Sequence, residues 1–238
     1  MHDVLIIWRK ELYNYFWSPI AYIVLPVFLI ISGYFFSFSL FYLQVANMSN
    51  ALHNMSIMLL LISPVLTMRL VAEERHSGSL DLLYSMPISI LSILIGKYLA
   101  AWSLLVIMLA CSTIFLVPLY MYGEPDFGPI FSGYLGIFLL GSVYLAVGLF
   151  VTSLRRNQIV VAIGTTGILI ILWFLTYLDN FDVTGLQGIR FSYLSVSVHF
   201  SEFVKGTIPI SSIIYMASLS WLFLFCSWIS LNAKRYHS

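Results

Sequence analysis

The chain has 238 residues, of which 61% are hydrophobic and only 9% are charged. An ordinary soluble domain has about 25% charged residues, so this composition excludes a soluble globular protein, a disordered chain and a disulfide-built secreted domain. The net charge of +1 provides no basic face for nucleic acid. Cys111 and Cys226 lie inside apolar runs and are interpreted as small buried hydrophobic side chains. The sequence therefore predicts an integral membrane protein.

Residues 1–18 mix charged with large apolar side chains ahead of the first long apolar run. Large apolar residues recur at helical spacing on one face, namely Leu5, Trp8, Leu12, Tyr15 and Phe16. This spacing predicts an amphipathic helix that lies in the cytoplasmic membrane interface. The alternative is a positively charged leader that only orients the first span.

Six apolar runs then follow, each close to the roughly 20 residues that a spanning helix needs. The predicted spans are residues 19–43, 52–70, 98–119, 129–153, 158–178 and 208–231. The predicted fold class is therefore an all-α membrane protein with six transmembrane helices in a single domain, residues 1–238. We place every charged residue outside the span interiors, with Lys97 directly before the third span.

The distribution of Lys and Arg predicts the orientation. With six spans, both termini lie on one side, and that side carries nine of the eleven basic residues. The nine are Arg9, Lys10, Arg69, Arg75, Lys97, Arg155, Arg156, Lys234 and Arg235. The other side carries Arg190 and Lys205. Because basic residues accumulate on the cytoplasmic side, both termini are predicted to be cytoplasmic.

The sequence lacks the residues that several classes of membrane protein require. Ion-coupled carriers and channels built from charged rings usually hold a charged group within the membrane, and none lies inside a predicted span. No H-E-x-x-H zinc motif and no G-x-x-x-x-G-K-[ST] phosphate loop occurs. We therefore assign no catalytic, metal or cofactor-binding residues, and an intramembrane hydrolase lacks a nucleophile.

The cytoplasmic segment 73–87, between the second and third spans, has the most distinctive pattern. It opens with the mixed-charge cluster Glu73, Glu74 and Arg75, and Gly78 then permits a sharp turn.

A short helix is predicted after that turn. Ser79 can cap it, Asp81 lies near the positive end of its dipole, and Pro87 ends it. Its apolar side chains are Leu80, Leu82, Leu83 and Met86. A capped apolar helix outside the membrane either docks a cytoplasmic partner or lies on its own protein, and the pattern leaves both open.

The pattern E-E-R-x-x-G-S-L-x-L-L-x-S-x-P of residues 73–87 resembles the coupling segment of type 2 ABC exporter permeases. Matches elsewhere cover essentially the whole chain, in order: Lys10-Glu11-Leu12 with Ser18-Pro19, Gly96-Lys97, Gly148-Leu149-Phe150 with Asn157-Gln158, and His199-Phe200. They are specific to the branch that contains the gliding-motility permease subunit GldF and the nitrous-oxide-reductase maturation permease NosY. Ser89-Ile90 departs from the acidic-aromatic pair that is common in this branch.

The resemblance implies a non-catalytic permease subunit in a bacterial cytoplasmic membrane. Its expected partners are two cytoplasmic ATPase subunits, which hold the ATP and Mg²⁺, and a second copy of the chain or a related permease subunit with or without a large extracytoplasmic domain. The implied ATPase-coupling residues are Glu73, Glu74, Arg75, Gly78, Ser79, Leu80, Asp81, Leu82, Leu83 and Pro87. The implied residues of the interfacial elbow helix are Trp8, Arg9, Lys10 and Glu11.

The extracytoplasmic loop 179–207 is the longest predicted on its side. Its stretch Phe191 to Phe203 is apolar enough to re-enter the interface as a short helix, and a plain linker with aromatic anchors is the alternative. For the whole chain, the alternative to a permease is a membrane scaffold that recruits a partner through the same segment without moving a substrate.

Overall fold

The computed structural model describes residues 2–42, 48–76, 89–123, 125–155, 157–180 and 191–235. These residues are predominantly helical and include no strand. Six helical runs among them are long and apolar enough to cross a membrane. The predicted all-α class with six spans is thereby confirmed.

The described elements are all helical. In chain order they are α1 (His2–Trp17), α2 (Pro19–Ser37), the π-helix η1 (Phe38–Tyr42), α3 (Ser49–His76), α5 (Ile90–Ser112), the 3₁₀-helix η2 (Thr113–Phe115), α6 (Leu116–Tyr122), α7 (Phe127–Leu154), α8 (Gln158–Phe174), the 3₁₀-helices η3 (Leu175–Asn180) and η4 (Phe191–Leu194), α9 (Val196–Val204) and α10 (Ile210–Arg235). Together α5, η2 and α6 form one apolar run from Ile90 to Tyr122.

Helices α3 and α5 extend furthest beyond the ends of the predicted spans. Helix α3 continues to His76, so its last turn includes the start of segment 73–87. Helix α5 begins at Ile90, where the Ser89 hydroxyl caps it by accepting a hydrogen bond from the Ser92 backbone N–H. Lys97, placed directly before the third span in the prediction, therefore lies inside this helix.

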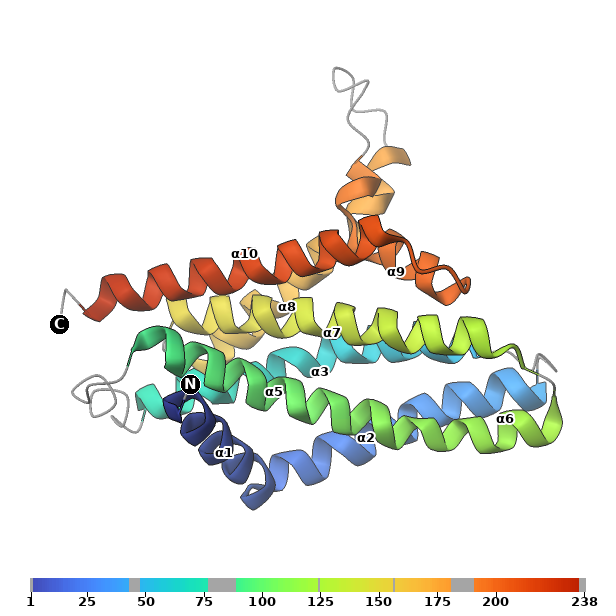
Figure 1. The fold of residues 1–238 in the computed structure, drawn as a ribbon, viewed down its shortest axis with the longest axis horizontal. Coiled ribbons are helices and arrows are strands. Elements are labelled where there is room, and N and C mark those ends of the chain that lie inside the picture. Colours follow the sequence, from blue (N-terminus) through green and yellow to red (C-terminus); the bar gives the residue numbers. More distant parts are fainter. Residues whose placement is uncertain are drawn as a thin grey trace.

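Most long helices run along the longest axis of the molecule (Figure 1). Both termini, the end of α3 and the start of α5 lie toward one end, which we call the terminal end. The turn between α6 and α7, together with α9, lies toward the opposite end, which we call the outer end. Helix α7 occupies the middle, since 78% of its span is buried, against 22% for the span of α10.

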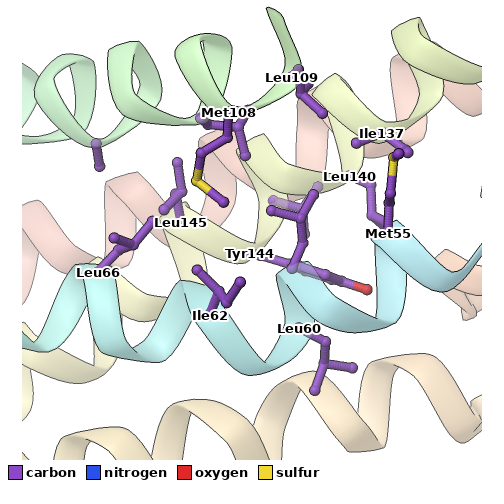
Figure 2. Packing of buried hydrophobic residues seen from close by; sticks show 14 of the residues in the cluster. Met55, Leu60, Ile62, Leu66, Met108, Leu109, Ile137, Leu140, Tyr144 and Leu145 are labelled. Atoms are coloured by element: carbon purple, nitrogen blue, oxygen red, sulfur yellow. The ribbon is translucent and has the colours of Figure 1, made fainter. Parts of the chain in front are cut away.

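The core lies between α7, α3 and α5. Figure 2 shows Tyr144 of α7 with its ring over α3, among Met55 and Leu60, while Met108 of α5 approaches from the opposite side. Tyr144 and Met108 are at most 1% exposed. Burial of this apolar surface within the protein accounts for the position of α7 in the bundle, and close packing rather than a solvent effect holds such helices together in lipid.

Glycines let α7 approach its neighbours closely. A methyl group at Gly148 would lie 2.1 Å from the Thr67 hydroxyl of α3, and one at Gly141 would lie 2.4 Å from Leu105 of α5. One at Gly136 would lie 2.6 Å from Phe203 of α9. These small residues therefore pack helices within the chain.

At the outer end, α9 crosses the ends of the long helices. The Ser132 hydroxyl of α7 donates to the Phe203 backbone oxygen at 2.7 Å, and the Ser195 hydroxyl donates to the Trp173 backbone oxygen of α8 at 3.0 Å. Gly206 turns the chain toward α10 with a φ of 92°, a conformation that favours glycine. The predicted short helix within residues 191–203 is thus present as η4 and α9.

Candidate functional site

Helix α1 packs one face against the terminal ends of α3 and α5. The buried stripe consists of Ile7, Glu11 and Tyr15, which recur every four residues and so lie on one side of the helix. Gly96 of α5 permits the contact, because a methyl group there would lie 2.8 Å from Ile7 Cβ. The opposite face of α1 exposes apolar and aromatic residues, including Trp17 at 78%. One face of the helix therefore binds the protein, and the other fits the membrane interface.

A buried lysine joins three helices at this point. Lys97 Nζ of α5 lies 2.9 Å from Glu11 Oε1 of α1 and also donates to the backbone oxygen of Leu70 in α3. The Lys97 and Glu11 side chains are only 2% and 7% exposed. We call Glu11, Lys97 and Leu70 the three-helix junction.

Two further hydrogen bonds flank the three-helix junction. The Trp8 indole N–H donates to the Ser103 hydroxyl of α5 at 2.9 Å. The Tyr15 hydroxyl donates to the Leu66 backbone oxygen of α3 at 2.9 Å. Contacts to both α3 and α5 therefore extend along α1 and fix its direction as well as its position.

The three-helix junction depends on both charges being present. A buried ion pair is a weak source of net stability, because each ion loses its hydration, but removal of one partner leaves an uncompensated buried charge. That loss costs about 3–5 kcal/mol. By contrast, Lys10 Nζ lies 3.9 Å from Glu11 Oε1, and its side chain is 47% exposed. The contact of Glu11 with Lys97 therefore determines how α1 packs on α5, and the exposed contact with Lys10 adds little stability.

The structure brings together some of the predicted site residues. Trp8 and Glu11 face the bundle from α1, whereas Arg9 and Lys10 are exposed on the same helix. Glu73, Glu74 and Arg75 belong to the last turn of α3. The remaining predicted coupling residues lie outside the described residues: Gly78, Ser79, Leu80, Asp81, Leu82, Leu83 and Pro87.

The role of Lys97 is absent from the sequence-based prediction. There, Gly96-Lys97 is only a match to a family, and Lys97 stands before the third span. A signal was present, because Lys97 stands between apolar residues on both sides, in Ile93-Leu94 and Leu99-Ala100. A lysine in such a run needs an acidic or carbonyl partner. Glu11, which stands four residues from both Ile7 and Tyr15 on the buried stripe, is that partner.

No group of three or more His, Cys, Asp or Glu side chains that could hold a metal ion occurs within the part of the chain that the structure describes. The three-helix junction connects α1 to α3 one turn before the charged cluster at Glu73, and to α5, the helix that follows segment 73–87.

Comparison with known proteins places the chain in a family. Residues 30–219 match the family model described as ABC-2 family transporter protein. A search of curated proteins found no match. The matched region begins in α2 and ends in α10, so it includes all of the described apolar runs in whole or in part. The chain therefore belongs to the ABC-2 family of transporter proteins, as an integral membrane permease component of an ABC transporter, a family that works with an ABC ATPase partner.

Proposed function

We propose that this chain is the permease subunit of a type 2 ABC exporter and that segment 73–87 couples it to a cytoplasmic ATPase. The observation that carries the proposal is the three-helix junction. Leu70 lies one helical turn before Glu73, and Lys97 lies in the helix that follows the segment. The helices before and after segment 73–87 are therefore held to the same helix, α1.

This arrangement gives a route for force. When an ATPase displaces segment 73–87, the load reaches α3 and α5 through their backbones, and Lys97 keeps these two helices and α1 together. Helix α1 has an apolar exposed face that fits the membrane interface, so it resists rotation of the helix pair out of that plane. The displacement is then passed along α3 and α5 toward the outer end.

The partners follow from the same proposal. Two ATPase subunits bind ATP and Mg²⁺, and the chain itself binds no cofactor and carries out no catalysis. Two permease subunits, either two copies of this chain or one copy with a related subunit, form the translocation path. Both termini face the cytoplasm, in agreement with the nine basic residues predicted on that side, and the membrane is the bacterial cytoplasmic membrane. The resemblance of residues 73–87 to the coupling segment of type 2 ABC exporter permeases supports this assignment.

Substitution of Leu82 by Asp tests the coupling. We expect Leu82→Asp to abolish co-purification of the cognate ABC ATPase and the stimulation of its ATP hydrolysis, because a carboxylate in an apolar contact loses its hydration. Leu194→Asp is the matched control, since Leu194 is 49% exposed at the outer end, and it should leave both unchanged. Unchanged co-purification and hydrolysis in Leu82→Asp would contradict the proposal.

The alternative is a membrane scaffold that recruits the ATPase without moving a substrate. The two functions differ in reconstituted complexes, because a transporter subunit responds to its substrate with a change in ATP turnover. A complex that binds the ATPase through Leu82 but shows constant turnover with every candidate substrate would favour the scaffold.

A further inference from the structure

A second polar network, partly buried, lies at the outer end between α9 and α10. His199 Nδ1 lies 2.7 Å from the Ser212 hydroxyl oxygen, and the Ser212 hydroxyl lies 2.5 Å from Glu202 Oε2. The other ring nitrogen, His199 Nε2, lies 3.0 Å from the Tyr193 backbone oxygen of η4. Ser212 is fully buried, and the His199 ring stacks on Tyr215 with ring centroids 4.4 Å apart. Three elements are therefore joined through one imidazole and one hydroxyl.

The donors in this network can be counted. A carbonyl oxygen only accepts, so the hydrogen bond to Tyr193 requires a hydrogen on Nε2. Ser212 has a single hydroxyl hydrogen for its contacts with both His199 and Glu202. If that hydrogen is donated to the Glu202 carboxylate, His199 Nδ1 must also carry a hydrogen, and the imidazole is a cation. If it is donated to Nδ1, the Glu202 carboxyl must be protonated.

Both assignments contain the same number of protons. In each, the His199 and Glu202 side chains together hold one proton more than a neutral imidazole beside a carboxylate. When that proton leaves to water, two hydrogens remain for the three contacts with Tyr193, Ser212 and Glu202. Whichever ring nitrogen keeps its hydrogen, one of the three contacts then has no hydrogen between its two atoms. Release of a single proton therefore removes one of the three hydrogen bonds that join η4, α9 and α10.

Few other charged or titratable groups can take over this role. Helices α7 and α8, which pack against α9, contain no Asp, Glu, Lys, Arg or His. From α10 the facing group is Tyr215, whose hydroxyl donates to the Leu194 backbone oxygen at 2.6 Å. From α3 the facing group is His53, whose ring stacks on Phe200 rather than on His199. Lys205, at the end of α9, is exposed.

We propose that His199, Ser212 and Glu202 form a proton-dependent clasp that holds the start of α10 against α9 and η4. Helix α9 is itself fixed to α7 and α8 by the Ser132 and Ser195 hydroxyls, so the clasp ties α10 to the rest of the outer end. The clasp is closed when the pair holds its proton, and it is weakened when the proton is released. Acidification of the medium at the outer end supplies the proton and so closes the clasp.

Spin-label distances in the full chain test this proposal. Cys111 and Cys226 are replaced by Ala, and labels are attached at Tyr193→Cys and Ile210→Cys, two positions that are 64% and 73% exposed. The Tyr193 substitution retains the backbone oxygen that accepts from His199. In phosphatidylcholine nanodiscs, we expect a narrow distribution of the η4–α10 distance at pH 5.5 and a distribution at least twice as broad at pH 8.5.

Three variants test which side chains cause the pH response of the distance distribution. His199→Gln, which does not titrate, should give the same width at both pH values. Ser212→Ala retains His199 and Glu202 but removes the hydroxyl between them, so its distance distribution should be broad at both pH values. His53→Gln is the matched control and should respond as the parent does.

Any of three results would overturn the clasp. One is an equal width at both pH values in the parent, and another is a pH response that survives in His199→Gln. The third is a loss of the response in His53→Gln. If His199→Gln does not fold, the test rests on Ser212→Ala, in which a retained pH response has the same meaning.

Discussion

Removal of the Lys97 charge should destabilise the protein strongly, because it strands a buried carboxylate. Methionine has nearly the length of lysine, so Lys97→Met keeps the packing against α1 and removes only the ammonium group. Glu11, 7% exposed, then loses its 2.9 Å contact with Lys97. Removal of one partner of a buried ion pair costs about 3–5 kcal/mol. Glu11→Met should cost a similar amount, because it strands the Lys97 ammonium group.

The two changes together should cost much less than their sum. Lys97→Met with Glu11→Met removes both charges, and such neutral replacements of buried pairs are often close to neutral in stability. The assay is reversible unfolding in mixed detergent and sodium dodecyl sulfate micelles, followed by the fluorescence of the six tryptophans. We expect the loss in free energy of unfolding in the double variant to be at most half of the loss in either single variant. Single losses below about 1 kcal/mol, or a double loss equal to the sum, would refute the reasoning.

Two further stability predictions follow from the packing. Gly148→Ala places a methyl group 2.1 Å from Thr67 Oγ1 and 2.6 Å from Thr67 Cβ, so it should cost about 1–3 kcal/mol in the same unfolding assay. Gly167→Ala meets nothing within 4 Å and should be neutral; equal losses in the two variants would contradict the packing of α7 on α3. Tyr15→Phe removes the hydroxyl that donates to Leu66 and should cost about 0.5–1.5 kcal/mol. A loss below the error of the assay would show that this hydrogen bond does not hold α1 to α3.

The existence of the six spans could be predicted from the sequence because each long apolar run has one stable form in lipid. Backbone polar groups must be satisfied within the segment, so such a run is helical whatever its neighbours. The ends were harder to predict. Helix α5 continues back to Ile90 because Ser89 caps it there and because Lys97 has partners inside the bundle. Span boundaries are predicted from the apolar character of the sequence, and neither the Ser89 cap nor the partners of Lys97 can be seen in it.

The three-helix junction could not be assembled from the sequence for a related reason. Glu11 and Lys97 are 86 residues apart, and each has a plausible place at a membrane surface when considered alone. The amphipathic pattern of α1 was visible, but the apolar face from Leu5 to Phe16 is only part of the helix's apolar surface. Leu5 is 58% exposed, whereas Ile7 on the stripe with Glu11 is buried. Because α1 is apolar on two sides, periodicity alone did not show which side faces the protein.

The outer-end network illustrates the same limit. His199 and Ser212 are 13 residues apart and are joined only because the chain turns at Gly206 with a positive φ. The sequence showed a polar residue in an apolar stretch, and that pattern is typical of an interfacial anchor. Its partners depend on the angle at which α10 leaves α9.

Photo-cross-linking of the permease to its ATPase would test the central claim, that segment 73–87 binds the ATPase, most directly. A photoreactive phenylalanine is incorporated at Leu82 or, for comparison, at Tyr193 in the full chain, in membranes that also contain the cognate ABC ATPase. We predict a cross-linked product of permease and ATPase for the probe at position 82 and none for the probe at position 193. A product from position 193, or none from position 82 while the complex still co-purifies, would contradict the account.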